Sequence, residues 1–400
     1  MSLKYNKFIC IYVLLAMFCR VQAGELSGHI AGELRYFPKS PLSADQYEEL
    51  NLSFSAQPEY RHEWDDGYQI FTFVPFVRVD QHDSERSHFD IRELTWLKAA
   101  DNWELRVGIR KLFWGVTESQ HLVDIINQTD LVEHPDTEDK LGQPMVNLAL
   151  LRDWGTVDLF ILPGFRERTF PGNEGRLFSG GIPIDTDQTR YESGAQEKHV
   201  DWAVRWEHSL SDWDIGLSHF SGTSREPRFL PSTNGAGRFV LIPYYEQINQ
   251  TGLDLQITKE DILWKLELIS RQEQEGRFTA LTGGLEYTFV GIFETDADVG
   301  IVTEYLFDDR HDNATTPFEN DFMFGMRLTL NDVQSTELLA GSIVDIDSRA
   351  SFYLIEASRR LGDSWKLSLD AYIYSNLPTD DMAYGFRNED FLQLELAWYF

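Results

Sequence analysis

Short segments in which apolar and polar residues alternate run through most of the chain. In residues 322–330, Phe322 and Phe324 belong to one face, and Arg327 belongs to the other. Alternation with a period of two predicts a β-strand that has one apolar and one polar face. Eighteen such segments are predicted: 24–37, 48–64, 68–82, 87–98, 103–114, 144–153, 155–166, 199–210, 213–224, 244–259, 262–273, 277–290, 297–308, 320–331, 335–346, 349–361, 364–376 and 389–400.

The connections between these segments alternate in length. Short turns such as 65–67, 211–212 and 362–364 are separated by longer connections. The longer connections are 115–143, 167–198, 225–243, 309–319 and 377–388, although 274–276 and 347–348, which belong to the same set, are short. An even number of strands, with short turns at one end and long loops at the other, is typical of a transmembrane antiparallel β-barrel. We therefore predict an all-β barrel of about 18 strands (16–18), with periplasmic turns and extracellular loops.

The tryptophans support a membrane barrel over a soluble sandwich. Eight of the eleven lie close to a predicted short turn or to the C-terminus: Trp64, Trp96, Trp103, Trp154, Trp213, Trp264, Trp365 and Trp398. Tryptophan concentrates at the level of the lipid headgroups, whereas a soluble sandwich would spread it through a core.

The N-terminal 23 residues have the features of a secretory signal. Lys4 and Lys7 precede an apolar run over 8–19, and Val21 and Ala23 place small residues before a cleavage point. The run is too short to span a membrane as a helix, which needs roughly 20 residues. We therefore expect Sec-type export, cleavage after residue 23, and a single barrel domain over 24–400. Both cysteines lie in the signal, and the mature chain would carry a net charge of -33.

Composition excludes several other classes. With 42% apolar residues and 14% aromatic residues the chain is not disordered, and two cysteines cannot make a disulfide scaffold. A formal charge of -30 argues against binding to nucleic acid. No nucleophile-elbow, zinc-protease or phosphate-loop spacing occurs, so we expect neither an enzyme nor a catalytic residue. No metal and no cofactor is expected either.

The C-terminal residues 392–400 end in Trp398-Tyr399-Phe400. This segment resembles the terminal strand of Gram-negative outer-membrane proteins. The resemblance implies that Trp398 and Phe400 form an assembly signal for the barrel-assembly machinery. It also implies an outer-membrane location, in contact with lipid and lipopolysaccharide, and a homo-oligomer is possible in that setting. Residues 105–115 and 124–131 resemble porin-like barrels of poorly known function, with Ile109-Arg110-Lys111 where those barrels commonly have Gly-Arg-Gln.

Charged residues on the polar faces should point into the lumen, because Lys or Arg facing lipid costs roughly 2–4 kcal/mol near the midplane. The predicted lumen-lining residues are Glu104, Arg106, Arg110, Arg205, Glu207, Asp254, Lys265, Glu267, Arg271, Glu286, Glu304, Arg327, Lys366, Asp370 and Glu395. The long loop 116–143 is the best candidate for a constriction, through His121, Asp124, Asn127, Asp130 and Glu133. The loop could equally remain outside as an acidic surface loop.

Eighteen strands leave room for water, so the favoured function is a channel for small polar solutes or ions. Seven basic and eight acidic residues make the predicted wall nearly neutral, and the acidic loops should therefore set a weak preference for cations. This preference should increase as salt falls. Two alternatives remain open. One is a transporter of a hydrophobic or specific substrate, if Phe73, Phe160 and Phe220 face inward. The other is a barrel with an adhesin or hydrolase function in its loops.

Overall fold

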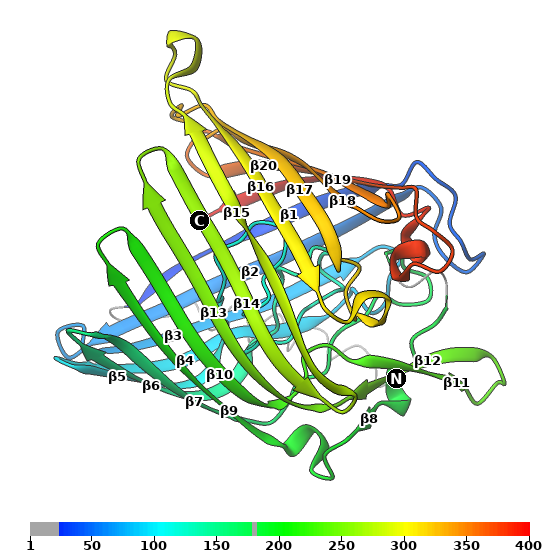
Figure 1. Cartoon of the computed structure of the whole chain (residues 1–400), viewed down its shortest axis with the longest axis horizontal. Helices are drawn as coiled ribbons and strands as arrows, with labels where there is room; N and C mark the ends of the chain where they lie inside the picture. The colour runs from blue at the N-terminus through cyan, green and yellow to red at the C-terminus, as the bar shows by residue number, and fades with distance from the viewer. Residues whose placement is uncertain (1–23, 178–181) are drawn as a thin grey trace, which may run out of the picture.

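The computed structural model of the 400-residue chain describes residues 24–177 and 182–400. The predicted signal, residues 1–23, lies outside the described residues. The central feature is an 18-stranded antiparallel sheet that closes on itself, because β1 pairs with β2 on one side and with β21 on the other (Figure 1). The prediction of an 18-stranded antiparallel barrel is confirmed.

The barrel strands run in chain order around the wall. They are β1 (Glu25–Tyr36), β2 (Leu50–Trp64), β3 (Gln69–Asp80), β4 (Phe89–Ala100), β5 (Trp103–Arg110), β6 (Gln143–Arg152), β7 (Gly155–Pro163), β9 (Val200–Leu210), β10 (Trp213–Thr223), β13 (Gln247–Lys259), β14 (Ile262–Glu273), β15 (Gly276–Phe289), β16 (Asp298–Asp308), β17 (Asn320–Thr329), β18 (Glu337–Asp345), β19 (Ser351–Leu361), β20 (Trp365–Ser375) and β21 (Phe391–Tyr399). All eighteen predicted segments are strands, and they differ from the prediction only at their ends.

Two long connections contain strands and turns where the sequence predicts only loop. The connection predicted over 225–243 holds a hairpin, β11 (Arg228–Thr233) and β12 (Phe239–Tyr245), and β12 pairs in parallel with β8 (Arg190–Tyr191). Gly237, at φ +74°, lies in the turn between the two hairpin strands. The prediction was wrong here because a strand outside the barrel has no lipid-facing side, and its sequence carries no clear alternation.

Helical structure among the described residues is confined to short 3₁₀ segments of three to five residues. These 3₁₀ turns are η2 (Thr186–Gln188), η3 (Gln196–Lys198), η4 (Ile292–Glu294), η5 (His311–Asn313) and η6 (Met382–Phe386). No helix in the described part of the chain is long and apolar enough to span a membrane.

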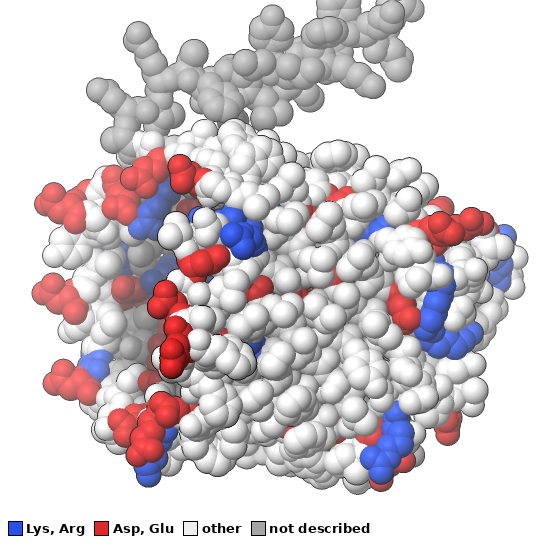
Figure 2. Space-filling model, turned by 90° about the horizontal axis from the view of Figure 1, so that it is seen from above, with Lys and Arg blue, Asp and Glu red and all other residues white. Residues whose placement is uncertain are grey.

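The outer surface of the barrel is apolar between two charged ends. Along β21, Leu392, Leu394 and Leu396 are exposed, whereas Gln393 between them is buried. The space-filling view shows the same arrangement, with a mostly uncharged belt and charged side chains gathered toward both ends (Figure 2). An apolar band of this kind suits contact with lipid.

Tryptophan marks the end that carries the short turns. Trp365 and Trp398 face each other across β20 and β21, beside the 362–364 turn, and both are exposed. Trp64, Trp213 and Trp264 are also exposed at the same end of their strands, and the exposed Trp154 lies in the β6–β7 turn at that end. Trp96 and Trp103 are partly buried there.

Candidate functional site: the constricted lumen

The connection between β5 and β6, residues 111–142, is hereafter the inner loop. It leaves the wall at Arg110, four residues before the predicted end of its strand, and crosses the interior. Two carboxylates on the far wall hold its first part. Glu267 of β14 accepts hydrogen bonds from the backbone nitrogens of Val116, Thr117 and Val123 at 2.8, 3.1 and 3.1 Å, and from the Thr117 hydroxyl at 2.7 Å.

Glu304 of β16 binds the next residues of the inner loop in the same way. Its carboxylate accepts the backbone N–H of Glu118 at 2.8 Å and that of Ser119 at 2.9 Å, together with the Ser119 hydroxyl. Both carboxylates are almost completely buried. Hydrogen bonds to a charged acceptor are stronger than neutral ones, so these two side chains fix the loop inside the barrel.

Apolar packing fills the lumen on one side of the inner loop. Trp114, Val123, Ile125 and Ile126 of the loop form one buried cluster with side chains of the wall. The wall members come from β6, β7, β9, β10, β13, β14 and β15: Met145, Phe160, Leu162, Ala203, Phe220, Ile248, Ile269, Phe278 and Ala280. Complete burial of each large apolar side chain contributes roughly 1.5–3 kcal/mol. The loop is therefore packed closely against this part of the wall.

This packing bears on the alternative of a hydrophobic substrate. Phe160 and Phe220 do face the interior, but the inner loop covers them and leaves them only 4% and 1% exposed. Phe73 shares the outward face of β3 with the exposed Val77 and Val79. None of the three aromatics therefore offers a surface to a solute in the lumen.

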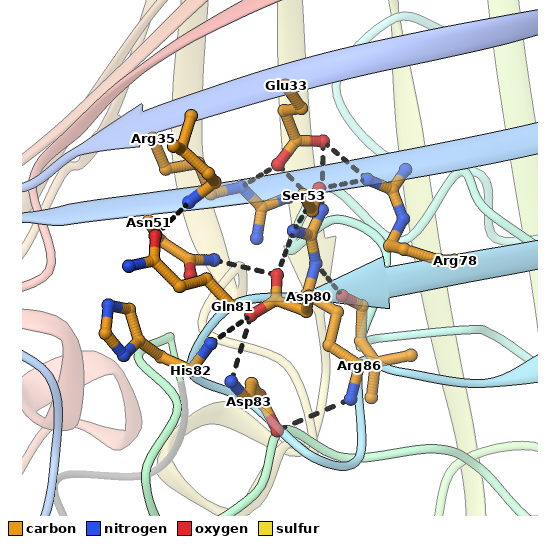
Figure 3. A network of polar contacts seen from close by, with 12 residues as sticks. Glu33, Arg35, Asn51, Ser53, Arg78, Asp80, Gln81, His82, Asp83 and Arg86 are labelled. Carbon is orange, nitrogen blue, oxygen red and sulfur yellow. Dashed lines mark hydrogen bonds and ion pairs between the residues drawn. The ribbon is translucent and has the colours of Figure 1, made fainter.

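A buried network of charges ties the inner loop to the opposite wall. Glu33 of β1 lies within 3.1 Å of Arg35, Arg78 and Arg86, and Arg86 also contacts Asp80 at 2.8 Å (Figure 3). Arg78 reaches across to Glu133 of the inner loop at 2.8 Å. Burial alone would raise the pKa of Glu133, but Arg78 and Arg86 lower it below its ordinary value, so this carboxylate is ionised.

Between the inner loop and this wall lies a cavity of about 270 Å³, hereafter the acidic cavity. Its lining comes from β1, β3, β19, β20, β21 and the second half of the inner loop. The residues are Glu33, Arg78, Glu133, His134, Asp136, Glu138, Asp139, Glu356, Asp370, Tyr372, Gln393 and Glu395. Eight carboxylates thus face a single guanidinium and one imidazole. The space left by the loop is strongly acidic.

The loop carboxylates of the acidic cavity differ in their protonation. Burial and the negative charges of Glu133 and Asp136 raise the pKa of Asp139 to about 6. Although burial opposes ionisation of Asp136, His134 lowers its pKa, and the two side chains form an ion pair at 2.7 Å. Asp139 is therefore the loop carboxylate that titrates near neutral pH.

The predicted lumen residues all lie on inward faces, but most have partners that fix them. Arg205 pairs with Asp254 at 2.7 Å, and Arg327 pairs with Glu118 of the inner loop at 2.7 Å. The other contacts join Glu104 to Arg106, Arg110 to Asn147, Lys265 to Glu118 and Glu286, Arg271 to Glu226 and Glu273, and Glu207 to Arg205. Lys366 is partly buried and forms no ion pair within the described ranges. Only Asp370 and Glu395 of the predicted set line the acidic cavity.

The five loop candidates divide between structural roles and the cavity. Asn127 binds the backbone at Leu112, Arg110 and Leu141, Asp124 pairs with Lys140 at 3.1 Å, and Asp130 pairs with Arg92 at 2.6 Å. His121 lies 3.8 Å from both Glu138 and Glu267. Burial opposes its protonation, but the nearby negative charges of those two carboxylates raise the pKa of His121 to about 9. Of the five, Glu133 alone lines the acidic cavity.

The predicted lumen set did not include Glu33, Arg78, Glu356, Tyr372 and Gln393 of the lining. All five lie in strands that were predicted, so their alternation with outward residues such as Leu34 and Ile355 could have identified their faces. Nothing in the sequence signals that these particular positions stand opposite the inner loop, because that depends on where the loop crosses the lumen.

In the described ranges, two clusters of three His, Asp or Glu side chains are spaced closely enough to hold a metal ion. One is His88, Asp130 and Glu133, and the other is Glu319, Asp321 and Asp345. In the first group Arg92 and Arg78 already neutralise the acids, which opposes a cation. The second group lies at the long-loop end of β17 and β18, away from the lining of the acidic cavity.

No protein-family model matches the chain, and no curated protein matches it. Several solved structures are similar to the chain. Pseudomonas aeruginosa OccK11 (OpdR) is 12% identical, with a TM-score of 0.52 over 94% of this chain and 95% of that one. This chain has the fold of a porin. A triple mutant of the Rhodopseudomonas blastica porin is 14% identical, with a TM-score of 0.45 over 94% of this chain and 100% of that one. At such identities the likeness concerns the porin fold alone.

Proposed function

We propose that this protein is a channel in the outer membrane of a Gram-negative bacterium, through which small polar solutes or ions diffuse passively. Cations pass in preference to anions. The channel performs no enzymatic reaction, and the chain reaches the membrane by Sec-type export and the barrel-assembly machinery. Its outer surface contacts lipid and lipopolysaccharide.

The observation that carries this proposal is the acidic cavity. The inner loop and its apolar cluster close one half of the lumen, so a solute must use the other half, where eight carboxylates gather. Charged groups at a narrow point determine which ions enter a pore. Elsewhere on the wall several opposite charges pair, as Arg205 does with Asp254 and Lys265 with Glu286.

Planar-bilayer recording of the purified protein tests the proposal. We expect discrete conductance steps and, under a KCl gradient, a reversal potential that indicates K⁺ preference. The preference should be larger in dilute salt, because the Debye length increases from about 8 Å at physiological ionic strength to about 30 Å at 0.01 M. A sealed barrel would refute the channel, and anion preference at low salt would refute the role of the acidic cavity.

A variant pair sharpens the assignment of the cavity. Glu395→Gln removes one charge from the acidic cavity and should reduce the K⁺ preference. Asp153→Asn removes one charge from the exposed β6–β7 turn and should leave the preference unchanged. An equal effect of both substitutions would mean that the overall charge of the protein, and not the acidic cavity, sets the selectivity.

A further inference from the structure

The apolar outer surface of the barrel is interrupted over four neighbouring strands, β10, β13, β14 and β15. Toward the long-loop end of these strands, two successive outward rows are polar, and together they are hereafter the polar outer face. The strand register aligns His219, Thr251, Ser270 and Thr279 in the first row and Ser221, Asn249, Gln272 and Arg277 in the second. The row between them is buried and faces the lumen: Phe220, Gln250, Arg271 and Phe278.

The polar outer face lies at a depth where other strands are apolar. Ser270 is six residues and Gln272 eight residues beyond Trp264, which marks the short-turn end of β14. Six to eight residues of a strand tilted by about 40° correspond to roughly 15–20 Å of height, within an apolar band that is about 25 Å tall. On β20, the residues six and eight positions beyond Trp365 are Ala371 and the exposed Ile373. The polar outer face is therefore a local departure from the lipid-facing pattern.

The side chains of this face do not satisfy one another completely. His219 Nδ1 lies 2.9 Å from the Thr251 hydroxyl, and Arg277 donates to the Ser270 hydroxyl at 3.1 Å. Within the described part of the chain, neither the Asn249 amide nor the Ser221 hydroxyl has a side-chain hydrogen-bond partner. Polar groups that are placed against hydrocarbon without a partner cost free energy, and lipid tails cannot supply one. A polar surface is therefore the better cover for this face.

The composition of the polar outer face favours a second copy of the chain over lipopolysaccharide. Its eight residues include no acid, and Arg277 is the only Lys or Arg. Anionic lipid headgroups are recognised by clusters of roughly 4–8 Lys or Arg residues, which this face lacks. Hydroxyl and amide groups both donate and accept hydrogen bonds, so such a surface can match a copy of itself. Copies inserted in the same direction can be related by a two-fold axis along the membrane normal, which brings equal depths together.

An apolar recess adjoins the polar outer face on the same strands, nearer the short turns. Its volume is about 320 Å³. The lining is Leu255, Ile257, Trp264, Lys265, Leu266, Leu281, Gly283 and Gly284. Gly283 keeps it open, because a Cβ at this position would lie only 3.0 Å from Leu266 Cδ1. An apolar side chain of a second copy can pack into the recess.

The size of the combined surface is sufficient for a specific contact. Four strands about 4.8 Å apart, each contributing about eight residues of roughly 3.3 Å, outline about 500 Å² on one copy. Two copies would bury about 1,000 Å² together, which is the lower limit for a stable protein interface.

We propose that the polar outer face and the adjoining recess form the contact between two copies of this chain, paired side by side in the membrane about a two-fold axis. Each copy covers the polar rows of the other, so neither exposes them to lipid tails. The inference depends on the location of the barrel in a membrane and not on what passes through its lumen.

Cysteine cross-linking in isolated outer membranes tests the pairing. Both native cysteines lie within residues 1–23, so an introduced cysteine is the only thiol of the mature chain. After oxidation with copper phenanthroline, we expect Thr251→Cys to give a reducible species of twice the monomer mass. Asn249→Cys tests the second polar row in the same way. Ile373→Cys on β20 is the matched control and should remain a monomer, because it is also outward and exposed.

A second pair of substitutions removes the polarity without burdening the fold. Ser270→Leu with Gln272→Leu suits lipid, so the barrel should still assemble, as heat-modifiable migration on gels would show. The Thr251→Cys cross-link should be lost in this background. Light scattering of the detergent-solubilised protein should show a dimer for the unmodified chain and a monomer for the leucine variant.

Four results would overturn the proposal. They are equal cross-linking at Thr251→Cys and Ile373→Cys, no cross-linking at either Thr251→Cys or Asn249→Cys in folded barrels, a cross-link that survives the leucine substitutions, and a monomer that loses copurified lipopolysaccharide when they are made. The last result would assign the surface to lipopolysaccharide. Because mass is measured and not current, each result holds whether or not the barrel conducts.

Discussion

The attachment of the inner loop to Glu267 can be tested by a single substitution. Glu267→Ala removes the acceptor of four hydrogen bonds and leaves the backbone N–H groups of Val116, Thr117 and Val123 without a partner. Each buried donor left unsatisfied costs about 1–3 kcal/mol. Water in the lumen can replace some of the lost hydrogen bonds, so we use the lower limit of this range for each N–H group. The free energy that holds the loop in place should then fall by on the order of 3 kcal/mol for the three groups together.

A loss of this size changes the population of the detached loop by about a hundredfold, since every 1.4 kcal/mol is a factor of ten. In single-channel recordings, Glu267→Ala should therefore show a higher conductance and frequent transitions between levels, whereas we expect the unmodified channel to show one stable level. Glu267→Gln keeps one acceptor oxygen, so its conductance should lie between those of Glu267→Ala and the unmodified channel. Glu207→Ala is the matched control, because Glu207 also faces the lumen, and among the described residues its carboxylate pairs with Arg205 alone, at 3.5 Å.

Heat-modifiable migration on gels should first establish that every variant forms a barrel. If Glu267→Ala then conducts like the unmodified protein, with the same noise, the loop is held by its apolar cluster alone and the reasoning about Glu267 is wrong. If Glu207→Ala raises the conductance as much as Glu267→Ala, the effect comes from lumen charge and not from loop attachment.

Three further outcomes are expected. Replacing Phe400 with Asp should reduce assembly into the outer membrane while export continues, as measured by membrane fractionation, and normal assembly would contradict the assembly signal. Because the pKa of Asp139 is raised to about 6, its charge is present above that pH and lost below it. The K⁺ preference should therefore fall between pH 7.5 and pH 5, with a smaller change in Asp139→Asn, and an identical pH profile in that variant would count against the assignment. Arg176 and Glu389 form a completely buried ion pair at 2.9 Å that joins the loop after β7 to the segment before β21. Arg176→Ala leaves the carboxylate unpaired at a cost of about 3–5 kcal/mol, so limited proteolysis should cut this loop faster, and an unchanged cleavage rate would refute that role.

The strands of the barrel wall could be predicted from the sequence, but the contacts in its interior could not. Lipid imposes an apolar residue at every second position, and that constraint made each of the eighteen strands visible, from β1 to the terminal β21. The β11–β12 hairpin lies outside that constraint, and it was missed. The same alternation placed residues such as Glu267 and Arg327 on the inward face.

The role of each inward residue depended on contacts between distant parts of the chain. Glu267 and Glu304 were predicted as lining charges, but they bind the backbone of a loop about 150 residues or more away in sequence. Asp124, Asn127 and Asp130 were predicted at the constriction, and they hold the inner loop in shape instead. The path of the inner loop through the lumen determines which acidic residues line the acidic cavity. No local sequence pattern predicts that path.

The acidic cavity lies across the junction where the first and last strands meet. Glu33 comes from β1, and Gln393 and Glu395 come from β21. Until these two strands pair, the lining of the cavity is divided between opposite edges of an open sheet. On the proposed function, selectivity is acquired only when the barrel closes, because a barrel that lacks the pairing of β1 with β21 would not bring the lining of the acidic cavity together.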